Sequence, residues 1–256
     1  MVAAGHQDAS AHFVAKWLQR EPEMAFAEVF CPAADKPQFR AWGALLHELR
    51  EALFELSDPG VARAKSGWWA EELLGLARGE SRHPVSATLI HDSAPWAALA
   101  RAMLEFPLDP PRAANTDEAL ALLAPLALAT VQVESVLFGA QASGEAASAL
   151  ATHWLVQRLP AGLASADQAR LPMHLLARHG MDTEALSPYL ANALLRDWAS
   201  ELLAALPERA QGAAWLRRSR LHFDRIRLQK LAVGQTASPL APWSSLWQAW
   251  RAARSS

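Results

Sequence analysis

The chain has 256 residues, of which 52% are hydrophobic and 20% are charged. This balance is sufficient for a continuous hydrophobic core and excludes an intrinsically disordered chain. A formal net charge of −2 gives no electrostatic reason to expect a nucleic-acid partner. Cys31 is the single cysteine, which excludes an intramolecular disulfide and fits a reducing compartment.

Two segments bear on where the protein is located. The first residues lack the basic start and apolar run of a secretory signal peptide. The uncharged segment 119–133 has 15 residues, fewer than the ~20 that a membrane-spanning helix needs, so we interpret it as a buried core helix. We therefore expect a cytoplasmic protein without a transmembrane segment, and we leave open a peripheral contact with the membrane surface.

Apolar residues recur with helical spacing along most of the chain. Leu45, Leu49, Leu53 and Leu56 follow the i, i+3/i+4 rhythm of an amphipathic helix. A helix is also expected after Ser93, and Thr116 is predicted to cap a helix that Gly139 closes. The remaining expected helices cover residues 68–79, 145–158, 171–179, 187–206, 208–231 and 239–253. No segment alternates at the strand period, so the sequence predicts one all-α domain over residues 1–256.

Three glutamates lie on the first of these helices. Glu48, Glu51 and Glu55 are three, four and seven residues apart, which places them roughly on one helix face. Carboxylates of this kind could ligate Mg²⁺ together with the phosphates of a substrate. The alternative is a solvated, charged helix face, which is the more common arrangement.

The segment 158–180 has leucines at two positions where carboxylates would form a metal site. Arg158 is followed by Leu159, and Leu163 lies four residues further on. Arg170 then begins an Arg-x-Pro-x-x-Leu-Leu sequence. Two carboxylates with an i, i+4 spacing would share a helix face and hold Mg²⁺, but two leucines cannot.

This segment resembles the squalene/phytoene synthase superfamily, in which the same arginine precedes two aspartates spaced by four residues. Similar segments occur in the same order at 39–50, at 64–73 with the pair Trp68-Trp69, at Phe223-Asp224 and at 238–251. Together they cover about residues 39–251. The last segment is closest to the phytoene-synthase-like complex I assembly factor subgroup, whose catalytic aspartates are also degenerate.

The resemblance implies a terpenoid-synthase-like helical bundle with an apolar pocket. It implies a binding or assembly protein, with an isoprenoid or lipid ligand, a protein partner and no metal or other cofactor, because a metal-binding wall is missing. The alternative is an active, Mg²⁺-dependent head-to-head prenyltransferase that uses the three glutamates. Whether the chain is an enzyme stays open, with the non-catalytic interpretation favoured. The pocket or substrate candidates are Trp68, Trp69, Arg158, Leu159, Leu163 and Arg170.

Two further faces lie near the carboxyl terminus. Arg217, Arg220 and Arg227 share one helix face by their spacing. This face could dock a diphosphate, anionic lipid headgroups or an acidic protein, or it could be a solvated face that Asp224 partly neutralises. A stripe of three tryptophans lies on the last helix, where core packing is the default interpretation and a partner-binding or interfacial stripe is the alternative; its members are Trp243, Trp247 and Trp250.

Overall fold

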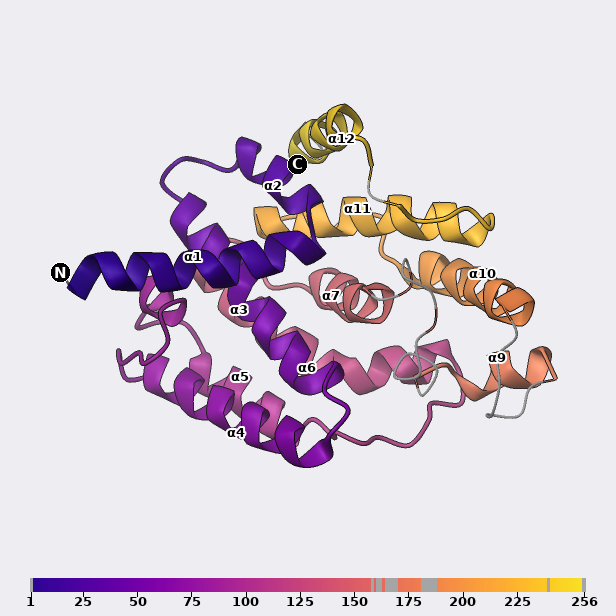
Figure 1. The fold of residues 1–256 in the computed structure, drawn as a ribbon, viewed down its shortest axis with the longest axis horizontal. Coiled ribbons are helices and arrows are strands. Elements are labelled where there is room, and N and C mark those ends of the chain that lie inside the picture. The colour runs from indigo at the N-terminus through magenta and orange to yellow at the C-terminus, as the bar shows by residue number, and fades with distance from the viewer. Residues whose placement is uncertain are drawn as a thin grey trace.

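The computed structural model describes residues 2–157, 159, 163, 170–180, 188–238 and 240–254, with residues 2–8 and 188–190 described by their backbone only. Within these ranges the regular elements are helices and no strand occurs (Figure 1). The all-α prediction is confirmed. The longer helices are α1 (Val2–Arg20), α3 (Lys36–Phe54), α4 (Pro59–Leu76), α5 (Trp96–Glu105), α6 (Thr116–Leu137), α7 (Gly144–Val156), α10 (Pro188–Ala205), α11 (Trp215–Ala232) and α12 (Pro242–Arg254). The shorter ones are α2 (Glu23–Ala27), α9 (Met173–Arg178) and the 3₁₀ turns Glu28–Phe30 and Ser86–Leu89.

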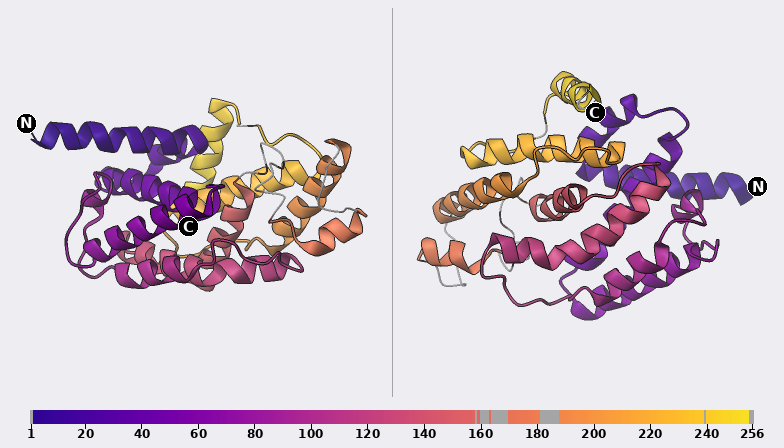
Figure 2. Two further views of the ribbon diagram at one scale, coloured as in Figure 1. Left: turned by 60° about the horizontal axis from the view of Figure 1, so that its bottom comes forward. Right: turned by 180° about the vertical axis from the view of Figure 1, so that it is seen from behind.

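Helix α3 runs through the interior, and almost every side chain from Phe39 to Phe54 is buried. It packs against α1 and α4. From α4 the chain continues through neighbouring helices, with α5 against α4, α6 against α5, and α7 against α6 and α11 (Figures 1 and 2). Helix α11 also contacts α10 and α12, and α12 contacts α2. The last helix, α12, therefore packs beside α2, which follows α1 near the start of the chain.

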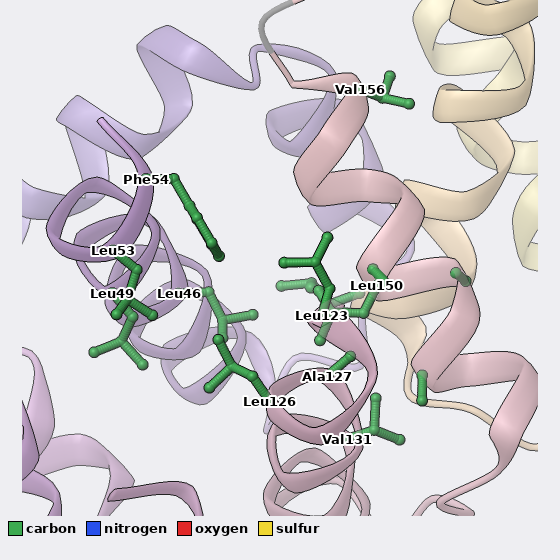
Figure 3. Packing of buried hydrophobic residues seen from close by; sticks show 14 of the residues in the cluster. Leu46, Leu49, Leu53, Phe54, Leu123, Leu126, Ala127, Val131, Leu150 and Val156 are labelled. Carbon is green, nitrogen blue, oxygen red and sulfur yellow. The ribbon is translucent and has the colours of Figure 1, made fainter. Parts of the chain in front are cut away.

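The core is built from leucine and alanine on the facing sides of α3, α6 and α7. Figure 3 shows Leu46 and Phe54 of α3 pointing toward Leu123 and Leu126 of α6, with Leu150 of α7 beside them. Alanines on α6 and α7 allow these helices to approach closely, because their side chains add little bulk. Apolar burial at this centre is the main force that holds the helices together.

Polar side chains begin three of the helices as local sequence rules predict. The side chain of Asp58 accepts hydrogen bonds from the Gly60 and Val61 amides at the start of α4. The side chain of Ser143 accepts one from the Ala146 amide at the start of α7. At α6 the capping residue is Asn115, which accepts from the Glu118 amide. The predicted cap at Thr116 was therefore displaced by one residue.

The boundaries of some other helices differ from the prediction. Helix α5 begins at Trp96 after Pro95, with no side-chain cap from Ser93. Helix α11 begins at Trp215 rather than at residue 208. Helices α1 and α2 were not expected, because large apolar residues are sparse over residues 2–20 and α2 has only five residues. Helix α1 is fixed by tertiary contacts instead.

A close contact joins α1 to α3. Trp17 is fully buried, and its indole ring lies over Gly43 so closely that a Cβ atom added to Gly43 would be 2.3 Å from the ring. Only glycine leaves this space free. The contact positions Lys16 and Arg20 of α1 over the acidic residues of α3.

Helix α6 is long and apolar enough to cross a membrane by length and composition alone. Half of its most apolar window is buried inside the bundle, where it packs against α5 and α7. The core helices of water-soluble proteins also pass this test, so α6 is weak evidence for a membrane span.

Candidate functional site

Two glutamates of α3 bind two lysines from neighbouring helices. Lys16 of α1 contacts Glu48 Oε1 at 2.8 Å and also contacts Glu51 Oε2. Lys65 of α4 contacts Glu48 Oε2 at 3.3 Å and Glu51 Oε1 at 3.0 Å. Each of the four carboxylate oxygens therefore has an ammonium partner. Burial raises the pKa of Glu51, but its hydrogen bonds to Lys16 and Lys65 outweigh burial and lower the pKa below its ordinary value.

Glu48 and Glu51 are the candidate ligands for the Mg²⁺ that the sequence resemblance associates with catalysis. One ligand atom each of His47, Glu48 and Glu51 lies within 4.8 Å of the others. Two ammonium groups already bind the carboxylates, and a divalent cation would have to enter beside two positive charges. The residues present therefore do not fit Mg²⁺.

The third glutamate is paired with arginines. Glu55 Oε1 lies 3.1 Å from the buried Arg50 guanidinium and 3.4 Å from that of Arg20. Arg50 also donates to Gln157 Oε1 at 2.8 Å, and its guanidinium lies 3.3 Å from His47 Nδ1. Burial lowers the pKa of His47 to about 4, with a further contribution from the charge of Arg50. His47 is therefore neutral at physiological pH.

The opposite wall of the expected clamp contains no described carboxylate. Leu159 is almost fully buried in the hydrophobic core, and Leu163 is partly buried and packs against it. Arg170 lies with its guanidinium 5.1 Å from the centre of the Phe54 ring and donates to the Phe54 carbonyl. Arg158 lies outside the described residues. The two leucines thus extend the apolar interior.

A chain of buried charged groups runs from Glu21, between α1 and α2, to α7 and α11. Arg220 donates to both oxygens of Glu21, at 2.7 and 2.9 Å. Burial raises the pKa of Glu21, but the positive charge and hydrogen bonds of Arg220, with the charge of Arg50, outweigh burial and lower it to about 2. His153 Nδ1 lies 2.7 Å from Asp224 Oδ2. These pairs join helices that are far apart in the sequence.

The tautomer of His153 follows from its neighbours. Burial lowers the pKa of this histidine, so it is neutral at physiological pH. Because the carboxylate of Asp224 can only accept, Nδ1–H donates to it, and Nε2 accepts from the amide of Gln157 at 3.1 Å. Gln157 therefore connects His153 to Arg50 of α3, and a buried hydrogen-bonded bridge links α3, α7 and α11.

The predicted basic docking surface on α11 is wrong. Arg217 and Arg220 are buried inside the bundle, and Arg227 is almost buried. Arg217 pairs with Glu134 and Arg220 with Glu21, while Arg227 pairs with Glu23 and Asp224. The three arginines do share one helix face, but that face points inward, because carboxylates of the α1–α2 region, α6 and α11 neutralise it.

An apolar pocket of about 340 Å³ lies at the carboxyl-terminal end of α3. Its walls come from Leu53 and Phe54 of α3, Leu123 of α6, and Trp154 and Leu155 of α7. The segment 106–113, rich in proline, covers one side, and Arg112 and Arg170 are its basic lining residues. A mostly apolar pocket with few polar groups is typical of a site for a small apolar ligand.

The two tryptophans expected in the pocket lie elsewhere. Trp69 is buried against His83, with ring centres 4.8 Å apart, and Trp68 is 39% exposed. Neither lines the pocket at the end of α3, because α4 turns this part of its surface toward His83 and Arg82. Trp154 supplies the pocket aromatic instead, half-buried with its ring centre 5.6 Å from that of Phe54.

Comparison with solved structures identifies the architecture. The crystal structure of a dehydrosqualene synthase in complex with a ligand matches this chain with a TM-score of 0.63 and 14% sequence identity, over 97% of this chain and 96% of that one. The chain has a terpenoid-synthase-like helical fold. No family model and no curated protein sequence matches it. At this identity the likeness concerns the fold alone.

Several residues of the site were not found from the sequence. Lys16, Lys65 and Gln157 bind the predicted glutamates or their partners, yet the sequence analysis singled out none of them as a site residue. Glu21 and His153 are the buried partners of α11, and their role depends on helices that meet only in the folded bundle. The sequence signal that could have identified them is a charged or polar residue within an otherwise apolar segment.

Proposed function

We propose that this chain is a divergent squalene/phytoene synthase-like protein that binds an apolar, isoprenoid-like ligand and does not condense prenyl diphosphates. The observation that carries the proposal is the pairing of Glu48 and Glu51 with Lys16 and Lys65. Ionising an allylic diphosphate requires cations that stabilise the departing charged group. Carboxylates that already bind two ammonium groups do not supply a metal clamp.

The central bridge supports the same proposal. Arg50, Gln157 and His153 connect α3 to α7 and α11 through hydrogen bonds of 2.7 to 3.1 Å. A condensing enzyme must hold two prenyl chains beside their diphosphates, and this buried bridge takes up part of the interior between α3, α7 and α11. The pocket at the end of α3, of about 340 Å³, is within the usual size range for one small ligand.

A role as an assembly factor or carrier would use the same pocket. An assembly protein would hold a protein partner as well as its ligand, whereas a carrier would hold the ligand alone. The protein purified from its host distinguishes them: a co-purifying protein in fixed ratio supports assembly, and an organic-solvent extract with isoprenoid lipid but no partner supports transport.

The deciding experiment is a turnover assay with farnesyl and geranylgeranyl diphosphates in the presence of Mg²⁺. Both released diphosphate and hydrocarbon product are measured, with an active dehydrosqualene synthase alongside. We expect neither product from this protein while it remains folded by circular dichroism. Condensed product that disappears in Glu51→Gln would overturn the proposal and identify an active prenyltransferase.

A further inference from the structure

Helix α12 carries its large side chains on the outside. Its buried residues are small, namely Ser245, Ala249 and Ala252, and they face α2 and α11. Trp243 and Trp247 lie on the other side, with exposed fractions of 82% and 56%. The usual arrangement of an amphipathic helix on a folded protein is the reverse, with the large apolar residues turned inward. The core-packing interpretation of this tryptophan stripe is therefore wrong.

The aromatic face is continuous and ends in positive charge. The rings of Trp247 and Trp250 are stacked with centres 4.7 Å apart, and the guanidinium of Arg254 lies 4.8 Å from the centre of the Trp250 ring. Arg251 is exposed beside them. The helix contains no acidic residue.

Neighbouring elements do not cancel this charge. Arg251 of α12 and Arg225 of α11 both contribute to lowering the pKa of His222, after burial of that histidine, so both cations lie near it. Glu28 is bound by Arg40 at 2.6 Å, and Glu23 is bound by Arg227 at 2.7 Å. The acidic residues of α2 and of the adjoining turn are thus already paired.

The position of α12 allows it to contact a broad surface. Figure 1 and the right view of Figure 2 show it at the margin of the bundle, beyond α11. Its exposed tryptophans and arginines can therefore meet a broad, flat surface.

We infer that α12 is an interfacial helix that docks the protein on a lipid bilayer containing anionic lipids, through Trp243, Trp247 and Trp250 with Arg251 and Arg254. Indole rings have an apolar body and an N–H donor, and they favour the boundary between headgroups and acyl chains. The arginines add electrostatic attraction to anionic headgroups. This inference is independent of any ligand bound at the end of α3.

The test is flotation of the full-length protein with vesicles of phosphatidylcholine alone or mixed with phosphatidylglycerol. We expect binding to the mixed vesicles that weakens with salt. The Trp243→Ser/Trp247→Ser variant should lose affinity on the order of tenfold, since the apolar insertion is removed. Arg251→Gln and Arg254→Gln should each reduce affinity by about fivefold. The matched control is Leu104→Ser on α5, a residue 60% exposed on another face, which should bind as wild type does.

Quenching of tryptophan fluorescence by phospholipids with brominated acyl chains provides a measurement on the unaltered protein. Partial quenching in mixed vesicles is expected, because only the α12 tryptophans would reach the bilayer. Absence of quenching, absence of flotation, or unchanged flotation of the double tryptophan variant would overturn the inference. A different result would also overturn the inference: a wild-type protein that is dimeric and does not bind vesicles, and a double tryptophan variant that is monomeric. That result would show that a second copy of the chain covers the tryptophan stripe.

Discussion

Whether Glu48 and Glu51 of α3 can bind a metal ion depends on which cations already contact their carboxylates. Lys16 is itself stabilised there, because burial lowers its pKa but hydrogen bonds to Glu48 and Glu51 outweigh burial and raise it. Each lysine ammonium group neutralises the carboxylates with a single positive charge held in place by its helix. Mg²⁺ would instead bring two positive charges and require near-octahedral coordination by oxygen ligands. The side chains therefore stabilise the junction of α1, α3 and α4.

Removing both lysines should create the metal affinity that the wild type lacks. We predict that millimolar Mg²⁺ leaves the melting temperature of the wild type unchanged and raises that of Lys16→Gln/Lys65→Gln. A gain of about 1 kcal/mol in unfolding free energy would shift melting by roughly 2–4 °C at this size. Differential scanning calorimetry measures the shift, with K⁺ at matched ionic strength as control. A wild-type protein stabilised specifically by Mg²⁺ would contradict this prediction.

The buried pair of Glu21 and Arg220 should make stability depend on acid pH. The pKa of Glu21 falls from 4.5 to about 2 on folding, so its contribution is complete above about 4.5 and is lost as the pH falls toward 2. This contribution is on the order of 3 kcal/mol. Urea unfolding between pH 6 and pH 3 is expected to show a shallower decline for Glu21→Gln than for wild type. Equal slopes would mean that Glu21 is not held ionised by its partner.

The sequence predicts the positions of residues that depend on spacing along one helix, and it does not predict their partners on other helices. The spacing of Glu48 and Glu51 brings both carboxylates to the same two lysines, whereas Glu55 pairs with Arg50 and Arg20, and none of the three forms the freely solvated face of the alternative. Their lysine and arginine partners come from other helices, which no local pattern connects to α3. The inward turn of Arg217 could not be found for the same reason, since its partner Glu134 lies 83 positions away.

At the scale of elements, the helices rich in leucine and alanine were predictable and α1 was not. Helix α6 was expected over its observed range, 116–137, because its cap region and closing Gly139 lie within a few residues of it. Helix α1 is less apolar than α6, and its position depends on a single large ring, Trp17, over the backbone of α3 at Gly43. Such tertiary contacts override local propensity.

The contact between α1 and α3 can be tested with a matched pair of glycines. Gly43→Ala would place a Cβ atom 2.3 Å from the Trp17 ring, and overpacking of this kind typically costs about 1–3 kcal/mol. Gly67→Ala on α4 has no atom within 4 Å of the new Cβ, so the higher helix propensity of alanine should stabilise the protein by up to about 1 kcal/mol. Chemical denaturation measures both. Similar effects of the two substitutions would show that Trp17 does not pack on Gly43.

At the scale of the whole molecule, the interior has an apolar part and a charged part. The core of α3, α6 and α7 continues directly into the pocket through Leu53, Phe54 and Leu123. The bridge from Arg50 to Asp224 lies on the side of α11. A fold similar to that of a dehydrosqualene synthase thus combines an apolar pocket with charges that are neutralised internally, and this combination supports the binding role that we propose.

An apolar ligand in this pocket should stabilise the entire bundle, because it binds the folded state only. At a concentration 100 times its dissociation constant, such a ligand adds about 2.7 kcal/mol to the unfolding free energy, or several degrees in melting temperature. We expect this rise with farnesol. Leu155→Asp places a charge in the pocket lining and should abolish the rise, because burying an unpaired carboxylate against an apolar ligand is costly. Leu128→Asp, on an α6 residue that is 43% exposed outside the pocket, should keep it. If both variants respond to farnesol as the wild type does, the ligand binds somewhere other than the pocket at the end of α3.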